Sequence, residues 1–246
     1  MKGTIFTLLS VTLLSAFSGS CQVNRQAPIS QNPNTSFPEH KKLSGKHILT
    51  GADQTDKYLP YLQGKRVGMV VNPTSIIGKT TSVDSLKALG VNIVAIFGPE
   101  HGFRGNASAG DKVDDSIDEK TGIPAISLYG KHQKPSAEDL KNIDVMIFDI
   151  QDVGVRFYTY INTLQHVMEA CAENGKELMI LDRPNPNGHY VDGPVLETKY
   201  KSFVGMQPVP IVYGMTIGEY AHMILEEGWL SKEAMEAYTQ NVLAAT

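Results

Sequence analysis

Short apolar runs alternate with amphipathic segments along most of the chain, from about residue 46 to residue 230. The apolar runs are rich in Val, Ile and Leu, and glycine, asparagine or aspartate commonly ends them. They predict buried strands at 66–72, 91–98, 123–130 and 144–150, another beginning at 177, and a possible sixth at 209–214. Strands that are apolar on both faces and separated by helices are typical of a parallel sheet covered on both sides.

Helical spacing of apolar residues lies between these runs. It predicts helices over 51–65, 81–90, 136–143, 160–175 and 216–229, the first with Tyr58, Tyr61 and Leu62 turned inward. Ser136 and Thr216 are expected helix caps, and Glu219 completes a capping box. The fold class is therefore α/β, a Rossmann-like and mostly parallel sheet with helices on both faces. No GxGxxG turn follows the first strand, so neither a dinucleotide nor another cofactor is expected.

Composition places the chain among soluble globular proteins, because 41% of its 246 residues are hydrophobic and 20% are charged. The net charge of −4 argues against a nucleic-acid partner, since no basic excess exists to displace phosphate counterions. The net charge does not exclude an anionic substrate, because binding of an anion needs only one or two arginines at the site.

The N-terminus has the pattern of an export signal. Lys2 precedes an apolar run too short to span a membrane, and the small residues after it end in Cys21. Residues 1–21 resemble a lipoprotein-type signal peptide with Cys21 as the lipidated residue, although an ordinary secretory signal is the alternative. The protein is then exported, with a periplasmic location and a lipid anchor in the membrane. Residues 22–45 predict a flexible linker, and Cys171, which lacks a disulfide partner, a buried inert thiol.

Polar side chains follow each predicted strand. In open parallel sheets, ligands bind beyond the carboxyl ends of the strands, so these residues are expected to meet at one edge. The positions are Asn72, Glu100 with His101, Tyr129, Asp149 with Gln151 and Asp152, and Asp182 with Arg183 and Asn185.

The stretch GPEHGFRG at 98–105 places an acid, an imidazole and a guanidinium among three glycines and a proline. Glycine allows sharp turns and close approach to a ligand, which favours a fixed pose for Glu100 and His101. A partly desolvated Glu100 is the expected general acid. The structural alternative is that Glu100 pairs with Arg104 and only shapes the turn.

Two further stretches carry polar groups that suit a sugar site. In FDIQDVGVRFYTYI (148–161), Asp149, Gln151, Asp152 and Arg156 offer partners for hydroxyl groups, while Tyr158 and Tyr160 offer ring faces. An Asp152–Arg156 pair that caps the next helix is the alternative there. In LDRPNPNG (181–188), a buried structural pair of Asp182 with Arg183 competes with a role in binding.

Weaker candidates complete the set. Glu197 lies in a predicted loop that could reach the edge of the sheet, and Glu219 is explained by capping. His166 is expected to be a satisfied helix residue. No HExxH, CxxC or similar spacing indicates a metal site, and no GxSxG nucleophile elbow is present.

Taken together, the stretches FGPEHGFRG, FDIQDVGVRFYTYI, LDRPNPNG and PIVYGMTIGEYA resemble the exo-β-N-acetylmuramidases of the NamZ type over about residues 46–230. The resemblance implies a Rossmann-like domain, a smaller C-terminal domain and a site in the cleft between them. It also implies release of terminal N-acetylmuramic acid from the non-reducing end of peptidoglycan fragments. The chain ends soon after EEGWL, so the smaller domain is expected to be largely absent, and the tail 231–246 matches no motif of the family.

The resemblance and the positions together give an expected mechanism. Glu100 is the catalytic acid, and a second carboxylate comes from Asp149, Asp152, Glu197 or the absent domain, unless the substrate's own N-acetyl group attacks. Arg104 or Arg156 binds the lactyl carboxylate of muramic acid, and His101 supplies a donor or proton relay. The rival hypotheses are a non-catalytic lipoprotein that binds muropeptides or sugars and, with less support, a sugar isomerase or epimerase.

Overall fold

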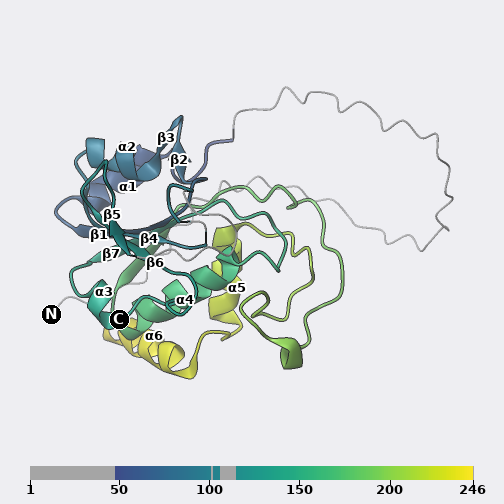
Figure 1. Ribbon diagram of the computed structural model, residues 1–246. Coiled ribbons are helices and arrows are strands. Elements are labelled where there is room, and N and C mark those ends of the chain that lie inside the picture. The colour runs from purple at the N-terminus through teal and green to yellow at the C-terminus, as the bar shows by residue number, and fades with distance from the viewer. Residues whose placement is uncertain (1–47, 101, 106–114, 246) are drawn as a thin grey trace, which may run out of the picture. The chain divides into compact units, whose positions relative to one another are not determined.

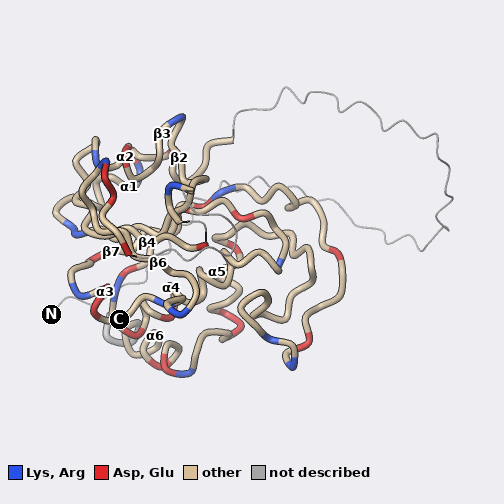
Figure 2. Tube along the Cα trace, in the orientation of Figure 1, with Lys and Arg blue, Asp and Glu red and all other residues tan. Residues whose placement is uncertain are grey.

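A computed structural model describes residues 48–100, 102–105 and 115–245. The predicted signal peptide with Cys21, the predicted linker 22–45 and His101 lie outside the described residues. None of the helices in the described part is long and apolar enough to cross a membrane. Charges of both signs are interspersed over the chain trace (Figure 2).

The centre of the fold is a sheet of strand order β5-β6-β4-β1-β7-β8. Its strands are β1 (Arg66–Val71), β4 (Asn92–Gly98), β5 (Ser116–Ile117), β6 (Pro124–Ser127), β7 (Val145–Asp149) and β8 (Glu177–Ile180). All neighbours pair in parallel except β5, which runs antiparallel to β6. β1 and β7 are almost wholly buried, because their apolar side chains point alternately to covered faces. The predicted α/β fold with a mostly parallel sheet is therefore confirmed.

Helices cover both faces of the sheet (Figure 1). They are α1 (Thr55–Leu62), α2 (Ser82–Ala88), α3 (Ala137–Leu140), α4 (Tyr160–Glu173), α5 (Ile217–Glu226) and α6 (Lys232–Ala245), with a 3-10 turn η1 (Thr198–Tyr200). One apolar core joins α1 and α2 to the sheet and includes Tyr58 and Leu62. The second core joins α4, α5 and α6 to the opposite face, with Leu230 and Ala234 anchoring the C-terminal helix.

The caps that the sequence predicts for two helices are present. Ser136 and Asp139 form a capping box at α3, and Thr216 and Glu219 form one at α5. In each, the hydroxyl accepts a backbone N–H and the acid accepts from the cap residue. These contacts fix where both helices begin.

Strand order determines where a ligand meets this fold. The chain proceeds from β1 through β4 to β6 on one side of β1 and then places β7 and β8 on the other. The crevice of such a sheet lies where the order reverses, at the carboxyl ends of β1 and its neighbours. Val71 and Asp149 are partners in the register of β1 and β7, so the residues after them emerge side by side.

The predicted strand at 209–214 is not formed. Val212 makes only isolated bridges, to Val155 and to Asp192. Pro208 and Pro210 lack the N–H groups that a ladder requires, which prevents regular pairing. The structure adds a small hairpin of β2 (Ile76–Ile77) and β3 (Thr80–Thr81), which the periodicity did not indicate.

Candidate active site at the carboxyl edge of the sheet

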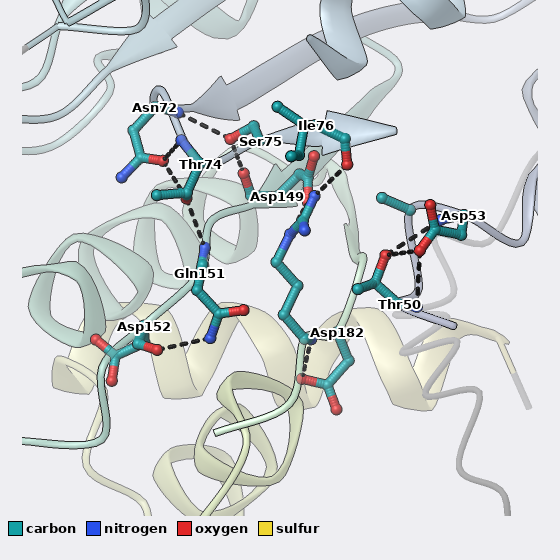
Figure 3. A network of polar contacts seen from close by, with 12 residues as sticks. Thr50, Asp53, Asn72, Thr74, Ser75, Ile76, Asp149, Gln151, Asp152 and Asp182 are labelled. Atoms are coloured by element: carbon teal, nitrogen blue, oxygen red, sulfur yellow. Dashed lines mark hydrogen bonds and ion pairs between the residues drawn. The ribbon is translucent and has the colours of Figure 1, made fainter. Parts of the chain in front are cut away.

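Polar side chains that follow β1 and β7 form one connected set (Figure 3). Asn72 Oδ1 accepts hydrogen bonds from the backbone N of Thr74 at 2.9 Å and from its hydroxyl at 2.5 Å. The hydroxyl oxygen of Thr74 in turn accepts from the backbone N of Gln151 at 3.0 Å. The Gln151 amide donates to the carbonyl oxygens of Asp152 and Pro184, each at 2.7 Å. These bonds hold the loops after the two strands against each other.

Asp152 is the carboxylate at the centre of this edge, and it is 5% exposed. Its Oδ2 accepts the backbone N–H of Gly154 at 2.7 Å and the hydroxyl of Tyr213. Its Oδ1 is buried without a hydrogen-bond partner among the described residues. Burial raises the pKa of Asp152, and the bonds from Tyr213 and Gly154 oppose that rise. The carboxyl group therefore holds a proton more readily than an exposed aspartate.

Glu100 lies two residues beyond β4 and is half-buried. The negative charge of Glu100 is the main reason that the pKa of Tyr129, after β6, is raised. Burial raises the pKa of Tyr160, and the charges of Glu100 and Asp152 add to the rise while the Asn72 amide opposes it. The charges of Glu100 and Asp152 therefore both add to the raised pKa of Tyr160.

Asp149 and Arg183 were both predicted to serve the site, and the structure pairs them in the interior instead. Arg183 Nε donates to Asp149 Oδ1 at 2.7 Å, and its Nη2 donates to the carbonyl of Ile76 at 2.9 Å. Asp149 has no exposed surface. A carboxylate that is sealed from substrate and neutralised by an arginine stabilises the fold, so we replace its predicted catalytic role with a structural one.

Asp182 and Asn185 attach the loop after β8 to the start of α5. Asp182 accepts the backbone N–H of Gly218 at 2.9 Å and the hydroxyl of Thr216 at 2.7 Å. Asn185 Nδ2 donates to the carbonyl of Met215 at 2.8 Å. The alternative Asp182–Arg183 side-chain pair is not formed, because the guanidinium of Arg183 binds Asp149. Both side chains are therefore engaged in contacts within the fold, which differs from their predicted role in binding.

Arg104 also differs from its predicted role. Its guanidinium bonds to Asp118 and Asp84, as described below, and does not pair with Glu100. Both the expected binding of a lactyl carboxylate by Arg104 and the alternative Glu100–Arg104 pair are therefore unsupported. A guanidinium with two carboxylate partners has little capacity left for a third.

Arg156 is the one arginine of the described chain whose side chain has no carboxylate partner. Its Nη1 donates to the carbonyls of Pro194 at 2.6 Å and Val209 at 2.5 Å. It does not form the alternative pair with Asp152. Tyr158, on the same stretch, is 48% exposed with its ring centroid 5.8 Å from that of Phe157.

Two remaining candidates lie elsewhere. Glu197 is exposed and forms an ion pair with Lys199 at 2.7 Å, so its predicted place at the site is not supported. His166 bonds to the carbonyl of Gln133 at 3.2 Å and stacks on Phe203, as a satisfied helix histidine does. Thr74 and Tyr213 were missed by the sequence reasoning, because a threonine in a turn and a tyrosine in an apolar run carry no distinctive signal. Among the described residues no cluster of His, Cys, Asp or Glu could hold a metal ion.

The fold and this edge define an α/β protein of Rossmann-like strand order, with the acids Glu100 and Asp152 following two of its parallel strands. Residues 67–244 match the family model described as exo-beta-N-acetylmuramidase NamZ, N-terminal. The chain therefore belongs to the NamZ family. The match includes most of the segment 231–246, which the motifs alone had left outside the family.

Known relatives agree with this assignment. The chain is 46% identical over 231 residues to the peptidoglycan beta-N-acetylmuramidase NamZ of Bacillus subtilis (strain 168), a match that covers 92% of this chain and 53% of that protein. Two crystal structures of DUF1343 family proteins from Bacteroides fragilis NCTC 9343 share its fold, each with a TM-score of 0.68. The first is 50% identical to this chain, and the match covers 75% of this chain and 48% of that protein. The second is 46% identical, and the match covers 74% of this chain and 47% of that protein. The chain thus spans about half the length of the relatives it matches.

Proposed function

We propose that this chain carries the catalytic acid of an exo-acting glycoside hydrolase, which releases terminal N-acetylmuramic acid from the non-reducing end of peptidoglycan fragments. The observation that carries the proposal is that Glu100 follows β4 and Asp152 follows β7 at the carboxyl edge of one parallel sheet, with Asp152 buried and without a cationic partner among the described residues. The family membership and the name of the Bacillus subtilis relative support the substrate class.

Glu100 is the proposed general acid, because it is half-buried just beyond β4 and its charge is the main cause of the raised pKa of Tyr129, which follows β6. It protonates the oxygen of the leaving sugar while the bond from that oxygen to the anomeric carbon breaks. His101, next in the chain, stays a proposed donor or proton relay.

Asp152 is the proposed second carboxylate. Of the other described candidates, Asp149 is sealed behind Arg183, and Glu197 pairs with Lys199 on the surface. Asp152 differs from Asp149 in having no cationic partner among the described residues, since its Oδ2 accepts only from Gly154 and Tyr213; one oxygen of each carboxyl group has no hydrogen bond there. Asp152 either orients the substrate's acetamido group for attack or acts as a general base on the attacking water. The anomeric configuration of the released sugar distinguishes these two mechanisms. Retention is expected from attack by the acetamido group and inversion from direct attack by water.

Arg156 is the proposed partner of the lactyl carboxylate. Only Nη1 has hydrogen bonds within the described chain, and these go to neutral carbonyls, so its charge is not cancelled by an acid. A guanidinium can bind a carboxylate through two parallel hydrogen bonds. Asn72, Gln151, Tyr158 and Tyr160 are the proposed contacts to the sugar ring and its hydroxyl groups.

The test is release of a chromophore from an aryl N-acetylmuraminide by the purified chain, alongside Glu100→Gln, Asp152→Asn and the surface control Glu197→Gln. We expect the first two variants to lose activity and the control to keep the activity of the unmodified chain. Activity that survives Glu100→Gln removes Glu100 from the chemistry. Saturable muropeptide binding without turnover by the unmodified chain favours the rival function, a binding lipoprotein.

We also propose that the protein is exported and held at the membrane by a lipid on Cys21. The basis is the sequence of residues 1–21, in which a lysine, an apolar run and small residues precede the cysteine. Metabolic labelling with a radioactive fatty acid tests it, with Cys21→Ser as the variant that should lose the label. Label retained in the variant contradicts the proposal.

A further inference from the structure

The loop that carries Glu100 folds back tightly on the end of β4. The backbone N–H of Gly102 donates to the carbonyl of Pro99 at 2.9 Å, and Gly102 has a φ of 68°. A Cβ on Gly98 would come within 2.9 Å of the backbone N of Phe103, so the returning chain needs glycine there. Glu100 therefore lies within a turn. The segment that leaves this turn, residues 102–105, is called the arm below, and its contacts determine how firmly the turn is fixed.

The two residues next to Arg104 attach this arm to the rest of the fold. Phe103 is buried in the core between the sheet, α1 and α2. Gly105 has a φ of 74°, and a Cβ there would come within 2.9 Å of the Pro73 ring. The arm is thus seated on the core and on the loop after β1, where Asn72 lies.

Arg104 joins the arm to two further segments. Its Nε and Nη2 donate to Asp118 Oδ1 and Oδ2 at 2.6 and 2.7 Å, a bidentate pair just beyond β5. Nη2 and Nη1 also reach Asp84 Oδ1 and Oδ2, in the first turn of α2, at 3.2 and 3.4 Å. The guanidinium carbon lies 4.6 Å from the centre of the Phe103 ring. One side chain therefore links the arm, α2 and the segment after β5.

Burial makes this link resistant to screening by solvent. The side chain of Arg104 is 23% exposed, and those of Asp84 and Asp118 are 9% and 4% exposed. The planar guanidinium offers donors in a fixed fork, which a lysine ammonium does not. Lysine at this position can keep the charge but not both bidentate contacts.

We propose that Arg104 is a positioning residue that fixes the turn carrying Glu100, so that the carboxyl group stays beside Tyr129 at the edge of the sheet. It touches no reacting atom and acts through the backbone of Gly102 and Phe103. The inference rests on the proposed function, in which Glu100 is the general acid. It adds a residue whose task is to hold that acid in place.

The first test compares substrates that differ in their need for protonation. A dinitrophenyl muraminide has a leaving group that departs without an acid, whereas a disaccharide does not. For Arg104→Gln we expect kcat on the disaccharide to fall by about 100-fold, with KM nearly unchanged, and to fall much less on the dinitrophenyl substrate. Arg104→Lys should lie between Arg104→Gln and the unmodified chain. Equal losses on both substrates, or no loss, overturn the proposal.

A control pair of similar geometry, although more exposed (42% and 40%), exists at the amino-terminal edge of the sheet. Arg66, at the start of β1, forms a similar bidentate pair with Asp144, at 3.1 Å from Nε and 2.7 Å from Nη2. Arg66→Gln removes a pair of the same chemistry far along the strand from the site. It should leave the ratio of the two kcat values unchanged. A shift in that ratio as large as that of Arg104→Gln would show general loosening of the fold and overturn the proposal.

A second test needs no turnover. The charge of Glu100 raises the pKa of Tyr129, which NMR of a ring-labelled protein can follow. Glu100→Gln should remove this rise, Arg104→Gln should reduce it, and Arg66→Gln should leave it intact. An unchanged Tyr129 pKa in folded Arg104→Gln protein overturns the positioning role. A reduced Tyr129 pKa in a chain that hydrolyses nothing upholds the positioning role while the proposed function fails.

Discussion

Arg183 Nε donates to Asp149 Oδ1 at 2.7 Å, and the two side chains are 5% and 0% exposed. This pair joins the ends of β7 and β8, and Arg183 Nη2 extends the connection to Ile76 in the hairpin after β1. Three of the loops that form the carboxyl edge therefore depend on one guanidinium. The buried position of the pair indicates a structural role at this edge.

Removal of one partner of this pair should destabilise the protein strongly. Arg183→Met leaves a buried carboxylate without its counter-charge, and we expect a loss of about 3–5 kcal/mol in the free energy of unfolding. Urea denaturation followed by circular dichroism measures it. Lys199→Met is the control, because its pair with Glu197 is exposed and should change stability by less than about 1 kcal/mol. Equal effects of the two substitutions would contradict a structural role for the Asp149–Arg183 pair.

Acid should weaken the fold through the carboxylates that bind Arg104. Hydrogen bonds from Arg104 lower the pKa of Asp118 to about 2. Burial acts to raise the pKa of Asp84, but bonds from Arg104 and Lys120 outweigh it and the pKa is about 2. Because both folded values lie below the ordinary 3.8, their contribution is complete above about pH 4 and is lost as the pH falls towards 2.

The measurement is the urea midpoint between pH 5 and pH 2. The free energy of unfolding should decrease by up to about 1.4 kcal/mol per pH unit for each such carboxylate. Arg104→Gln should show a shallower decrease over this range, because its Asp118 titrates near the ordinary value in both states. Parallel curves for the two proteins would show that Arg104 is not the cause.

Gly154 should tolerate no side chain. It has a φ of 76°, and a Cβ there would overlap the amide group of Asn185. Its N–H also binds Asp152, so Gly154→Ala should lower both stability and activity. Gly64→Ala is the matched control, with a φ of 72° and open space around it, and should cost only about 1 kcal/mol. Thermal melts and the chromophore assay compare them, and similar losses in both would refute the packing explanation.

The thiol of Cys171 should be inert in the folded protein. Burial raises its pKa to about 12, and the side chain has no exposed surface. In a Cys21→Ser background, a disulfide reagent should react with it only after denaturant is added. Rapid labelling of the native protein would show that α4 opens far more readily than its packing indicates.

The strands and helices were predictable because each satisfies a local rule. The run at 66–72 is apolar without interruption and forms β1, and Thr216 with Glu219 marks the start of α5. The run at 209–214 is also mostly apolar, but Pro208 before it and Pro210 within it lack the N–H donors of a ladder. The pairing of β5 depends on contacts that no two-residue pattern can indicate.

The site was predictable only in outline. Glu100 and Asp152 follow strands of a parallel sheet, and strand order brings them to one edge. Whether a charged side chain is held in an ion pair depends on partners distant in the sequence, as for Asp149 with Arg183 and Arg104 with Asp118. Arg104 binds Asp84, which lies on another element, and nothing in GPEHGFRG indicates that contact. Sequence alone could name the residues at the edge but not divide them between chemistry and support.

The ends of the sheet have a consequence for how the protein behaves at high concentration. β5, the strand at one margin, comprises only Ser116–Ile117, and β8 at the other comprises Glu177–Ile180. An exposed edge strand can pair with a strand of another chain, and a short edge strand offers few hydrogen bonds for such pairing. The longest and most apolar strands, β1 and β4, have neighbours on both sides. The sheet is thereby protected from growing into an aggregate by edge-to-edge addition.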